Sequence, residues 1–333
     1  MTREDKIHAF HQLGKQLEQL SDDEFQSLAT DTRNQNPWFT EDNIRRSFDG
    51  ITRWLDKKSL DDWISTYDFN ISPRKIAVVM AGNIPLVGFH DFLSVLISGH
   101  SLLIKSSSKD KVLLTFIVEM LTSIEPRFKS KIEYADQLKG FDAIIATGSD
   151  NTSRYFEYYF KKYPHIIRKN RTSVAIVDGH ETLEDLTALG DDIFSYFGLG
   201  CRNVAKIFLP AGFRIDTLFE CWSKFKEIIN HHKYCNNYDY QKSVLLITQA
   251  PFLDNGFVML QENKKLFSPL AVVYYEFYTD QKALAQTLEP VRSKIQCVVS
   301  NEEGSVKFGG AQSPMLGDYA DQIDTLKFLT TLP

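Results

Sequence analysis

The chain has 333 residues and a mass of 38.3 kDa, which at roughly 150 residues per domain predicts two domains. Apolar residues make up 43% of the sequence and charged residues 24%, so a disordered or low-complexity chain is excluded. The net charge is −5 and the basic residues are scattered along the chain, which argues against a nucleic-acid partner or an anionic membrane surface.

Several features bear on the compartment. No apolar segment of the secretory type follows the N-terminal residues, and apolar stretches such as residues 84–97 are too short and too polar to span a bilayer. The cysteines lack paired or zinc-type spacing, which is typical of reduced thiols. They are Cys201, Cys221, Cys235 and Cys297. We therefore expect a cytoplasmic protein without a membrane span.

Two polar pairs need an interpretation. His231 and His232 are adjacent, but no second ligand pair has suitable spacing, so we expect no metal site. Asp191 and Asp192 are predicted to lie on a solvated helix face.

The pattern of elements changes near Pro73. Residues 4–70 are predicted as helices, because apolar residues recur there at helical spacing. After Pro73, short buried strands alternate with helices, which is typical of a doubly wound parallel sheet. The predicted order is strand 75–80, helix 87–98, strand 101–105, helix 109–123, strands 131–134 and 143–146, then strand 174–177, helix 183–197 and strands 204–209, 243–248 and 270–277. We place the domain boundary near residue 172.

The ends of three strands carry small or polar residues. In open α/β sheets ligands bind beyond the carboxyl ends of the strands, which here are followed by residues 81–85, 105–108 and 147–150. The G-x-G-x-x-G and Walker fingerprints are absent. Small side chains would leave backbone N–H groups available to a phosphate. Ordinary strand-to-helix turns with serine caps are the alternative interpretation.

Cys201 is the most informative single residue. Gly198 and Gly200 precede it, and they permit a turn that brings its backbone N–H and sulfur toward a ligand. A nucleophilic cysteine needs its thiolate, and the neighbouring Arg202 is a cation that favours it. A buried, inert cysteine is the alternative.

Taken in order from about residue 73 to 320, these segments resemble the aldehyde dehydrogenase superfamily and, within it, the LuxC-type acyl-CoA reductases. Residues 82–85 are similar to the W-N-F-P segment of the superfamily, residues 99–107 to G-N-x-V-V-x-K-P-S, residues 146–149 to F-T-G-S, residues 198–201 to the nucleophile loop and residues 267–269 to F-G-P. The resemblance implies two doubly wound, three-layer α/β/α domains with a helical N-terminal segment. Residues 1–172 would bind a nicotinamide dinucleotide, and residues 173–333 would hold the nucleophile and a C-terminal return segment.

The resemblance also assigns roles to residues. Cys201 would attack an acyl thioester, while the Asn83 amide and the Cys201 N–H stabilise the oxyanion. Lys105 would bind the adenosine ribose or its phosphate, Ser149 would lie near the pyrophosphate, and Phe267 would pack on the nicotinamide. The implied cofactor-binding set is Gly82, Lys105, Ser107, Ser108, Thr147, Gly148, Ser149 and Phe267.

Three departures from the dehydrogenase pattern shape the expected chemistry. Residues 168–172 replace the segment E-L-G-G-K, which carries the catalytic base, so no carboxylate stands there to activate water. Ser108 replaces a ribose-binding glutamate of NAD-dependent members, which removes repulsion against a 2′-phosphate and favours NADPH, with NADH as the alternative. Lys265 replaces a second glutamate, one that holds the nicotinamide ribose.

The resulting hypothesis is an NADPH-dependent reduction of a fatty acyl-CoA, or another acyl thioester, to the aldehyde through an acyl-Cys201 intermediate. One alternative is a reductase of acyl phosphates or semialdehyde precursors on the same fold. Another is a non-reducing subunit that carries an acyl group for an acyl-protein synthetase or transferase partner. We also expect a homo-oligomer.

Overall fold

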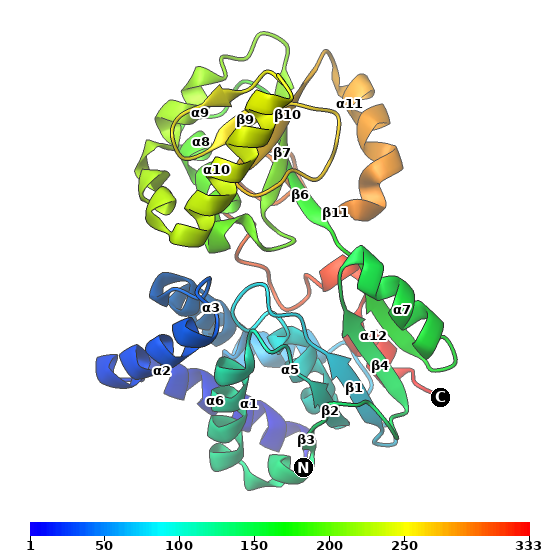
Figure 1. Ribbon diagram of the computed structural model, residues 1–333. Helices are drawn as coiled ribbons and strands as arrows, with labels where there is room; N and C mark the ends of the chain where they lie inside the picture. The colour runs from blue at the N-terminus through cyan, green and yellow to red at the C-terminus, as the bar shows by residue number, and fades with distance from the viewer. The chain divides into compact units, whose positions relative to one another are not determined.

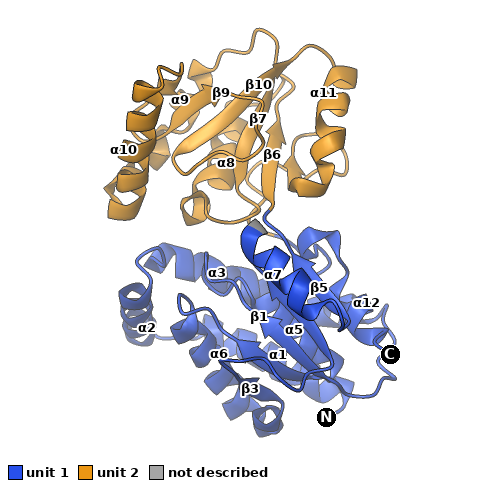
Figure 2. Cartoon of the chain, turned by 45° about the vertical axis from the view of Figure 1, so that its right-hand side comes forward, with its two compact units in different colours: residues 1–170, 314–333 blue, residues 171–313 orange. Residues whose placement is uncertain are grey.

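The computed structural model describes residues 1–149 and 151–333, and residue 150 only as part of a helix (Figure 1). The chain forms two compact units (Figure 2). Unit 1 comprises residues 1–170 and 314–333, and unit 2 comprises residues 171–313. The sequence-based division assigns residues 314–333 to the second domain, whereas in the structure they pack within unit 1. No helix of the described residues is long and apolar enough to cross a bilayer.

Unit 1 begins with four helices. They are α1 (Arg3–Glu18), α2 (Asp22–Gln35), α3 (Glu41–Trp54) and α4 (Lys57–Ile64). Each of these helices begins after an N-cap residue with a short side chain whose oxygen accepts a backbone hydrogen bond. Thr2 and Ser21, for example, each form a reciprocal capping box with an acidic residue three positions later. The apolar faces of these helices lie in the core of unit 1, where Phe10 and Leu13 of α1 are fully buried.

The sheet of unit 1 is wholly parallel, with the strand order β3-β2-β1-β4-β5. The elements in chain order are β1 (Lys75–Val79), α5 (Phe89–Ser98), β2 (Ser101–Lys105), α6 (Lys111–Ile124), η1 (Pro126–Ser130), β3 (Ile132–Tyr134), β4 (Ala143–Thr147), α7 (Asp150–Phe160) and β5 (His165–Arg168). Successive side chains along a strand point to opposite faces of the sheet and belong to different hydrophobic cores. Ile76 and Val78 pack with the N-terminal helices, α5 and α6, whereas Ala77 packs with Phe156 and Phe160 of α7. The sheet is therefore covered by helices on both faces.

The C-terminal segment of unit 1 contains η5 (Ala320–Gln322) and α12 (Thr325–Thr330). Buried hydrogen bonds attach it to the rest of the unit: the ring nitrogens Nε2 of His90 and His100 pair with the carbonyl oxygens of Leu316 (2.9 Å) and Leu329 (3.0 Å). The guanidinium of Arg168 donates to the Asp91 carboxylate and to the Thr325 hydroxyl. The segment is thus an integral part of unit 1.

Unit 2 holds a six-stranded sheet of order β11-β6-β7-β10-β9-β8, in which β8 alone is antiparallel to its neighbour. The elements are β6 (Thr172–Ile176), α8 (Leu183–Phe194), η2 (Ser195–Gly198), β7 (Val204–Pro210), α9 (Asp216–Cys221), η3 (Ser223–Asn230), α10 (His232–Ile247), β8 (Leu253–Asp254), β9 (Met259–Glu262), β10 (Val272–Tyr278), α11 (Gln281–Leu288), η4 (Glu289–Lys294) and β11 (Ile295–Val299). One face of this sheet packs against α8 and α9, and the other face packs against α11.

Two sequence-based assignments in unit 2 are wrong. Residues 243–247 form the end of α10, with Thr248 as its C-cap, rather than a strand, because the buried residues Tyr234, Tyr238 and Leu245 share one helical face while Ile247 is 82% exposed. The helix predicted over residues 183–197 ends at Phe194, where the chain enters a tight turn.

Candidate functional site

The carboxyl edge of the unit 1 sheet gathers the sequence-predicted cofactor residues other than Phe267, which belongs to unit 2. Strands β2, β1 and β4 are adjacent and parallel, so the segments that follow them, residues 106–110, 80–88 and 148–149, emerge at the same edge. From β1 the chain proceeds to β2 and β3 on one side and then returns to β4 on the other. The strand order therefore reverses between β1 and β4, which is where open α/β sheets bind ligands.

Gly82 and Ser107 are in close contact at this edge. A Cβ atom on Gly82 would lie 2.4 Å from the Ser107 Oγ and 2.7 Å from its Cβ, so a side chain is excluded here. Asn83, Lys105 and Ser108 are exposed on the same loops. Lys105 is paired with Val79 in the β2–β1 ladder and ends its strand. The loops thus offer an exposed amide and an exposed ammonium beside a glycine that packs closely on the Ser107 side chain.

The third segment leads into helix α7. The Ser149 hydroxyl caps this helix by accepting a hydrogen bond from the Thr152 N–H. A Cβ on Gly148 would lie 3.0 Å from side-chain atoms of Thr152 and Phe156, so the glycine lets the turn pack tightly on the helix. Thr147 ends β4 and is half-buried. A helix N-terminus at the edge of the sheet suits an anionic group.

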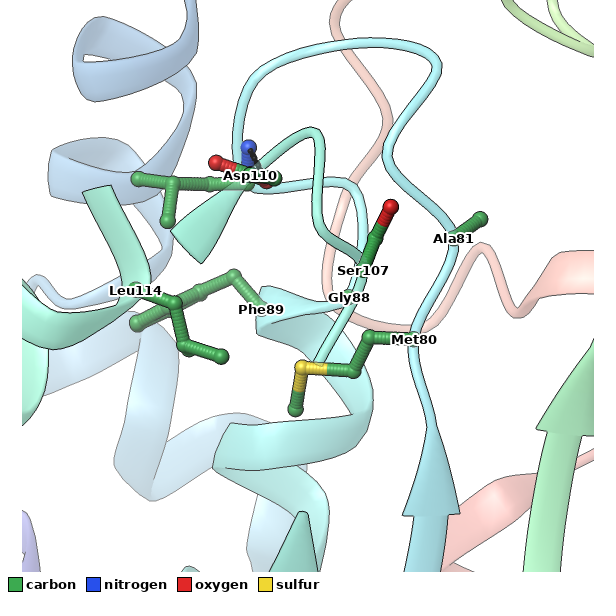
Figure 3. Close-up of a pocket in the computed structure, with 8 residues that line it drawn as sticks. Met80, Ala81, Gly88, Phe89, Ser107, Asp110 and Leu114 are labelled. Atoms are coloured by element: carbon green, nitrogen blue, oxygen red, sulfur yellow. Dashed lines mark hydrogen bonds between the residues drawn. The ribbon is translucent and has the colours of Figure 1, made fainter. Parts of the chain in front are cut away.

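Asp110, which no sequence pattern marks as a site residue, lines a small pocket behind these loops (Figure 3). The pocket has room for about one water molecule. Asp110 Oδ2 accepts a hydrogen bond from the Leu86 N–H at 2.7 Å, while its Oδ1 is buried without a partner among the described residues. Burial raises the pKa of Asp110 to about 8. An aspartate directly before a helix is usually interpreted as the N-cap of that helix. Asp110 has this position, but its side chain makes no capping hydrogen bond to α6.

Cys201 belongs to unit 2 and its side chain is exposed. It lies in a turn between η2 and β7, after three consecutive residues in the left-handed region: Tyr196 (φ 52°), Phe197 (φ 59°) and Gly198 (φ 78°). The two non-glycine residues carry strain of about 1–3 kcal/mol each, which the surrounding contacts must offset. The Cys201 carbonyl oxygen accepts a hydrogen bond from the Ser173 hydroxyl at 3.0 Å. The thiol is therefore presented by a loop with fixed backbone.

Asp192 and Arg202, which precede and follow that loop in the chain, both bind the segment of residues 309–311. The prediction that Asp192 lies on a solvated helix face is wrong: the side chain is fully buried and accepts hydrogen bonds from the N–H groups of Gly309 (2.7 Å) and Ala311 (2.8 Å). Burial raises the pKa of Asp192 to about 6. Asp191, in contrast, is half-buried and pairs with Lys224. Arg202 donates from Nε to the Ala311 carbonyl.

The remaining residues of the sequence analysis have these surroundings. Phe267 of unit 2 is half-buried and packs against the core between the sheet and α11, and Lys265 is exposed. Arg168 of unit 1, in the stretch that replaces E-L-G-G-K, is buried in the ion pair with Asp91. His231 caps α10, and its ring lies against that of Phe197 with centroids 4.2 Å apart. Among the described residues, no group of three or more His, Cys, Asp or Glu is placed to hold a metal ion.

Comparisons with known proteins define the fold and the family. The family described as acyl-CoA reductase (LuxC) matches residues 12–217, more than half of the chain, while no curated protein matches the sequence. Among solved structures, aldehyde dehydrogenase 21 from Physcomitrella patens, in complex with succinate, has 12% identity and a TM-score of 0.69 over 99% of this chain and 84% of its own.

Two further structures are similar to this chain. An aldehyde dehydrogenase from Bacillus cereus in complex with NAD⁺ has 12% identity and a TM-score of 0.64, over 91% of this chain and 73% of its own. An NADP-dependent enzyme from E. coli has 10% identity and a TM-score of 0.67, over 90% of this chain and 73% of its own. The fold is therefore that of aldehyde dehydrogenases, and the chain belongs to the acyl-CoA reductase (LuxC) family.

Proposed function

We propose that this protein reduces a fatty acyl-CoA, or a related acyl thioester, to the aldehyde with NADPH, through a thioester between the acyl group and Cys201. The observation that carries the proposal is the exposed Cys201 thiol on a strained, hydrogen-bonded loop in a chain of the acyl-CoA reductase (LuxC) family. An accessible thiol on a preorganised turn is what a nucleophile needs.

The residues at the carboxyl edge of the unit 1 sheet fit a nicotinamide dinucleotide. The Gly82–Ser107 contact leaves no side chain between ligand and backbone, and the capped N-terminus of α7 provides N–H groups for the pyrophosphate. The exposed Lys105 ammonium would hold the adenosine ribose or its phosphate. The family resemblance gives Phe267 the role of packing on the nicotinamide ring.

The chain's own residues then divide the reaction into two steps. In the first, the Cys201 thiolate bonds to the thioester carbonyl carbon, and the bond to the CoA sulfur breaks as CoA leaves as a thiolate that takes up a proton. The Cys201 N–H would stabilise the negative charge that develops on the carbonyl oxygen, and the family resemblance gives the Asn83 amide the same role. A reduced nicotinamide, when bound, supplies a hydride, the two electrons that the second step needs. Breakage of the bond from carbon to Cys201 Sγ then releases the aldehyde and restores the thiolate.

Reduction of the acyl-Cys201 thioester is favoured over its hydrolysis because residues 168–172 lack a general base. This stretch has no carboxylate, and its Arg168 side chain is engaged in the buried ion pair with Asp91. A water molecule would find no general base there, so an acyl-Cys201 thioester should persist until it is reduced.

NADPH is favoured by the residue at position 108. Ser108 is exposed and uncharged where a carboxylate would repel a 2′-phosphate, and Lys105, the last residue of the strand before it, adds positive charge. NADH would bind without that electrostatic gain.

The test is aldehyde formation with NADPH and a series of acyl-CoA chain lengths, comparing wild type with C201A and with C235A as the matched control. Cys235 is half-buried on α10, outside the proposed site. We expect C201A to abolish aldehyde formation and C235A to retain it. Aldehyde formation by C201A at the wild-type rate would refute the mechanism.

A further inference from the structure

Asn203 is buried and forms hydrogen bonds to the loop that carries Cys201. Its side chain is 3% exposed, and its Oδ1 accepts a hydrogen bond from the Gly200 N–H at 2.8 Å. Its own backbone N–H donates to the Gly200 carbonyl at 3.1 Å. Gly200 immediately precedes Cys201, so Asn203 fixes the peptide group that leads into the nucleophile.

The other end of the Asn203 side chain holds the end of helix α8. Its Nδ2 donates to the carbonyl oxygens of Asp192 (3.1 Å), Ile193 (3.2 Å) and Ser195 (2.8 Å). The last four carbonyls of a helix have no partner within it, and this amide donates to two of them, those of Asp192 and Ile193, and to that of the C-cap Ser195. One side chain therefore joins both ends of the left-handed run of residues 196–198.

This arrangement does more than terminate a helix. A Schellman or αL cap needs a single left-handed residue and backbone hydrogen bonds, whereas here three left-handed residues follow one another and a side chain from beyond the loop closes it. Such strain persists only where the surroundings over-determine the backbone. Releasing either end of the Asn203 amide would let the loop relax and turn Cys201 away.

We propose that Asn203 is a positioning residue for Cys201: its side-chain amide clamps residues 192–200 and thereby sets the direction of the Cys201 thiol and backbone N–H. The inference rests on the proposed function of Cys201 as the acyl acceptor. It assigns the amide no contact with substrate, only control of the geometry from which Cys201 acts.

The substitutions N203A and N203D separate the two ends of the clamp. Ala removes every side-chain hydrogen bond. Asp keeps an acceptor for the Gly200 N–H but removes both donors and brings a carboxylate against three carbonyl oxygens. The matched control is N255A, because Asn255 of the same unit also accepts backbone N–H hydrogen bonds in a turn, but from Phe257 and Val258, which are not part of residues 192–200.

The experiment measures acylation of Cys201 by quenched-flow mass spectrometry over a range of acyl-CoA concentrations. The second readout is the pH profile of iodoacetamide alkylation at Cys201. Misplacement by about 1 Å costs on the order of 100-fold in rate, so we expect the maximal acylation rate of N203A and N203D to fall by about that factor with little change in half-saturation. The alkylation midpoint should also shift in both variants, while N255A matches wild type. Circular dichroism confirms folding, and if N203A does not fold, N203D decides the test.

The outcomes separate this inference from the proposed function. Wild-type acylation rates in a folded N203A or N203D variant, or equal losses in N255A, would overturn the role of Asn203 and leave the function standing. If wild type itself forms no adduct, the proposed function fails, and the alkylation profile then decides: a profile unchanged by N203A and N203D overturns the positioning role, and a shifted one supports it.

Discussion

The Asp110 carboxyl group holds the backbone N–H of Leu86 at 2.7 Å, and Leu86 is a non-glycine residue with a φ of 53°. The carbonyl of the preceding residue, Pro85, accepts a hydrogen bond from Ser47 of α3 at 2.9 Å. The loop that carries Asn83 is therefore fastened on both sides, by α3 and by the start of α6. Its strained turn is maintained by long-range contacts rather than by its own sequence.

The substitution D110N should stabilise the protein increasingly as the pH rises from about 4 to about 8. Burial raises the folded-state pKa of Asp110 from 3.8 to about 8, so between these values the unfolded chain has lost a proton that the folded chain keeps. Stability therefore falls with pH across this window and levels off above it. An asparagine side chain does not titrate in this range, and its amide oxygen can still accept the hydrogen bond from the Leu86 N–H.

Thermal unfolding midpoints measured across that pH range check this prediction. Relative to wild type, D110N should gain at least about 3 °C between the two ends. D110A, which lacks both the titration and the hydrogen bond, should be less stable than D110N by about 1–3 kcal/mol at every pH. A constant difference between wild type and D110N at every pH would show that Asp110 titrates normally.

The ion pair between Arg168 and Asp91 should be costly to break from one side. R168M leaves the Asp91 carboxylate buried without its cation, and we expect a loss of about 3–5 kcal/mol in the stability of unit 1. The double substitution R168M with D91L removes both charges and should recover much of that loss. Denaturant unfolding of the single and double variants measures the coupling, and additive losses would contradict a paired, buried interaction.

The substitution G82A should weaken cofactor binding. The new Cβ would lie 2.4 Å from the Ser107 Oγ, so the loops after β1 and β2 must move apart by roughly 1 Å to reach ordinary contact. We expect the KM for NADPH to rise by about tenfold or more. G317A is the matched control, because a Cβ there meets no atom within 4 Å. Equal kinetics in G82A and wild type would exclude these loops from the cofactor site.

The substitution S108E tests the choice of cofactor. A carboxylate there should repel a 2′-phosphate and reduce the preference for NADPH over NADH by about tenfold. S130E is the control, because Ser130 precedes β3 at the opposite, amino edge of the parallel sheet. The ratio of kcat/KM for the two cofactors is the measurement, and an unchanged ratio in S108E would place the 2′-phosphate elsewhere.

Much of the fold could be predicted from the sequence, because buried parallel strands are recognisable as continuous apolar runs. β1, β2, β4 and β7 are of this kind. β5 escapes prediction since its apolar run, between His165 and Arg168, is only Ile166 and Ile167. The apolar run in residues 243–248 has strand-like composition, but the buried Tyr234 and Tyr238 extend a helical face through it.

The candidate site was predictable where a strand end or a glycine marked it, as at Gly82 and Ser107. Asp110 and Asn203 were not, because each acts on backbone groups of another segment, and sequence alone does not reveal which carbonyl or N–H a buried side chain meets. Asp192 was misplaced for the same reason: its partners, at residues 309 and 311, lie more than a hundred residues away in the chain.

The acyl-Cys201 intermediate is tested most directly by intact-protein mass spectrometry after mixing with a medium- or long-chain acyl-CoA, with and without NADPH. The account predicts a mass increase equal to the acyl group, mapped to Cys201, which disappears when NADPH is added as aldehyde forms. An adduct that persists with NADPH would instead indicate a carrier or transferase. The absence of any adduct at Cys201 would contradict the covalent mechanism.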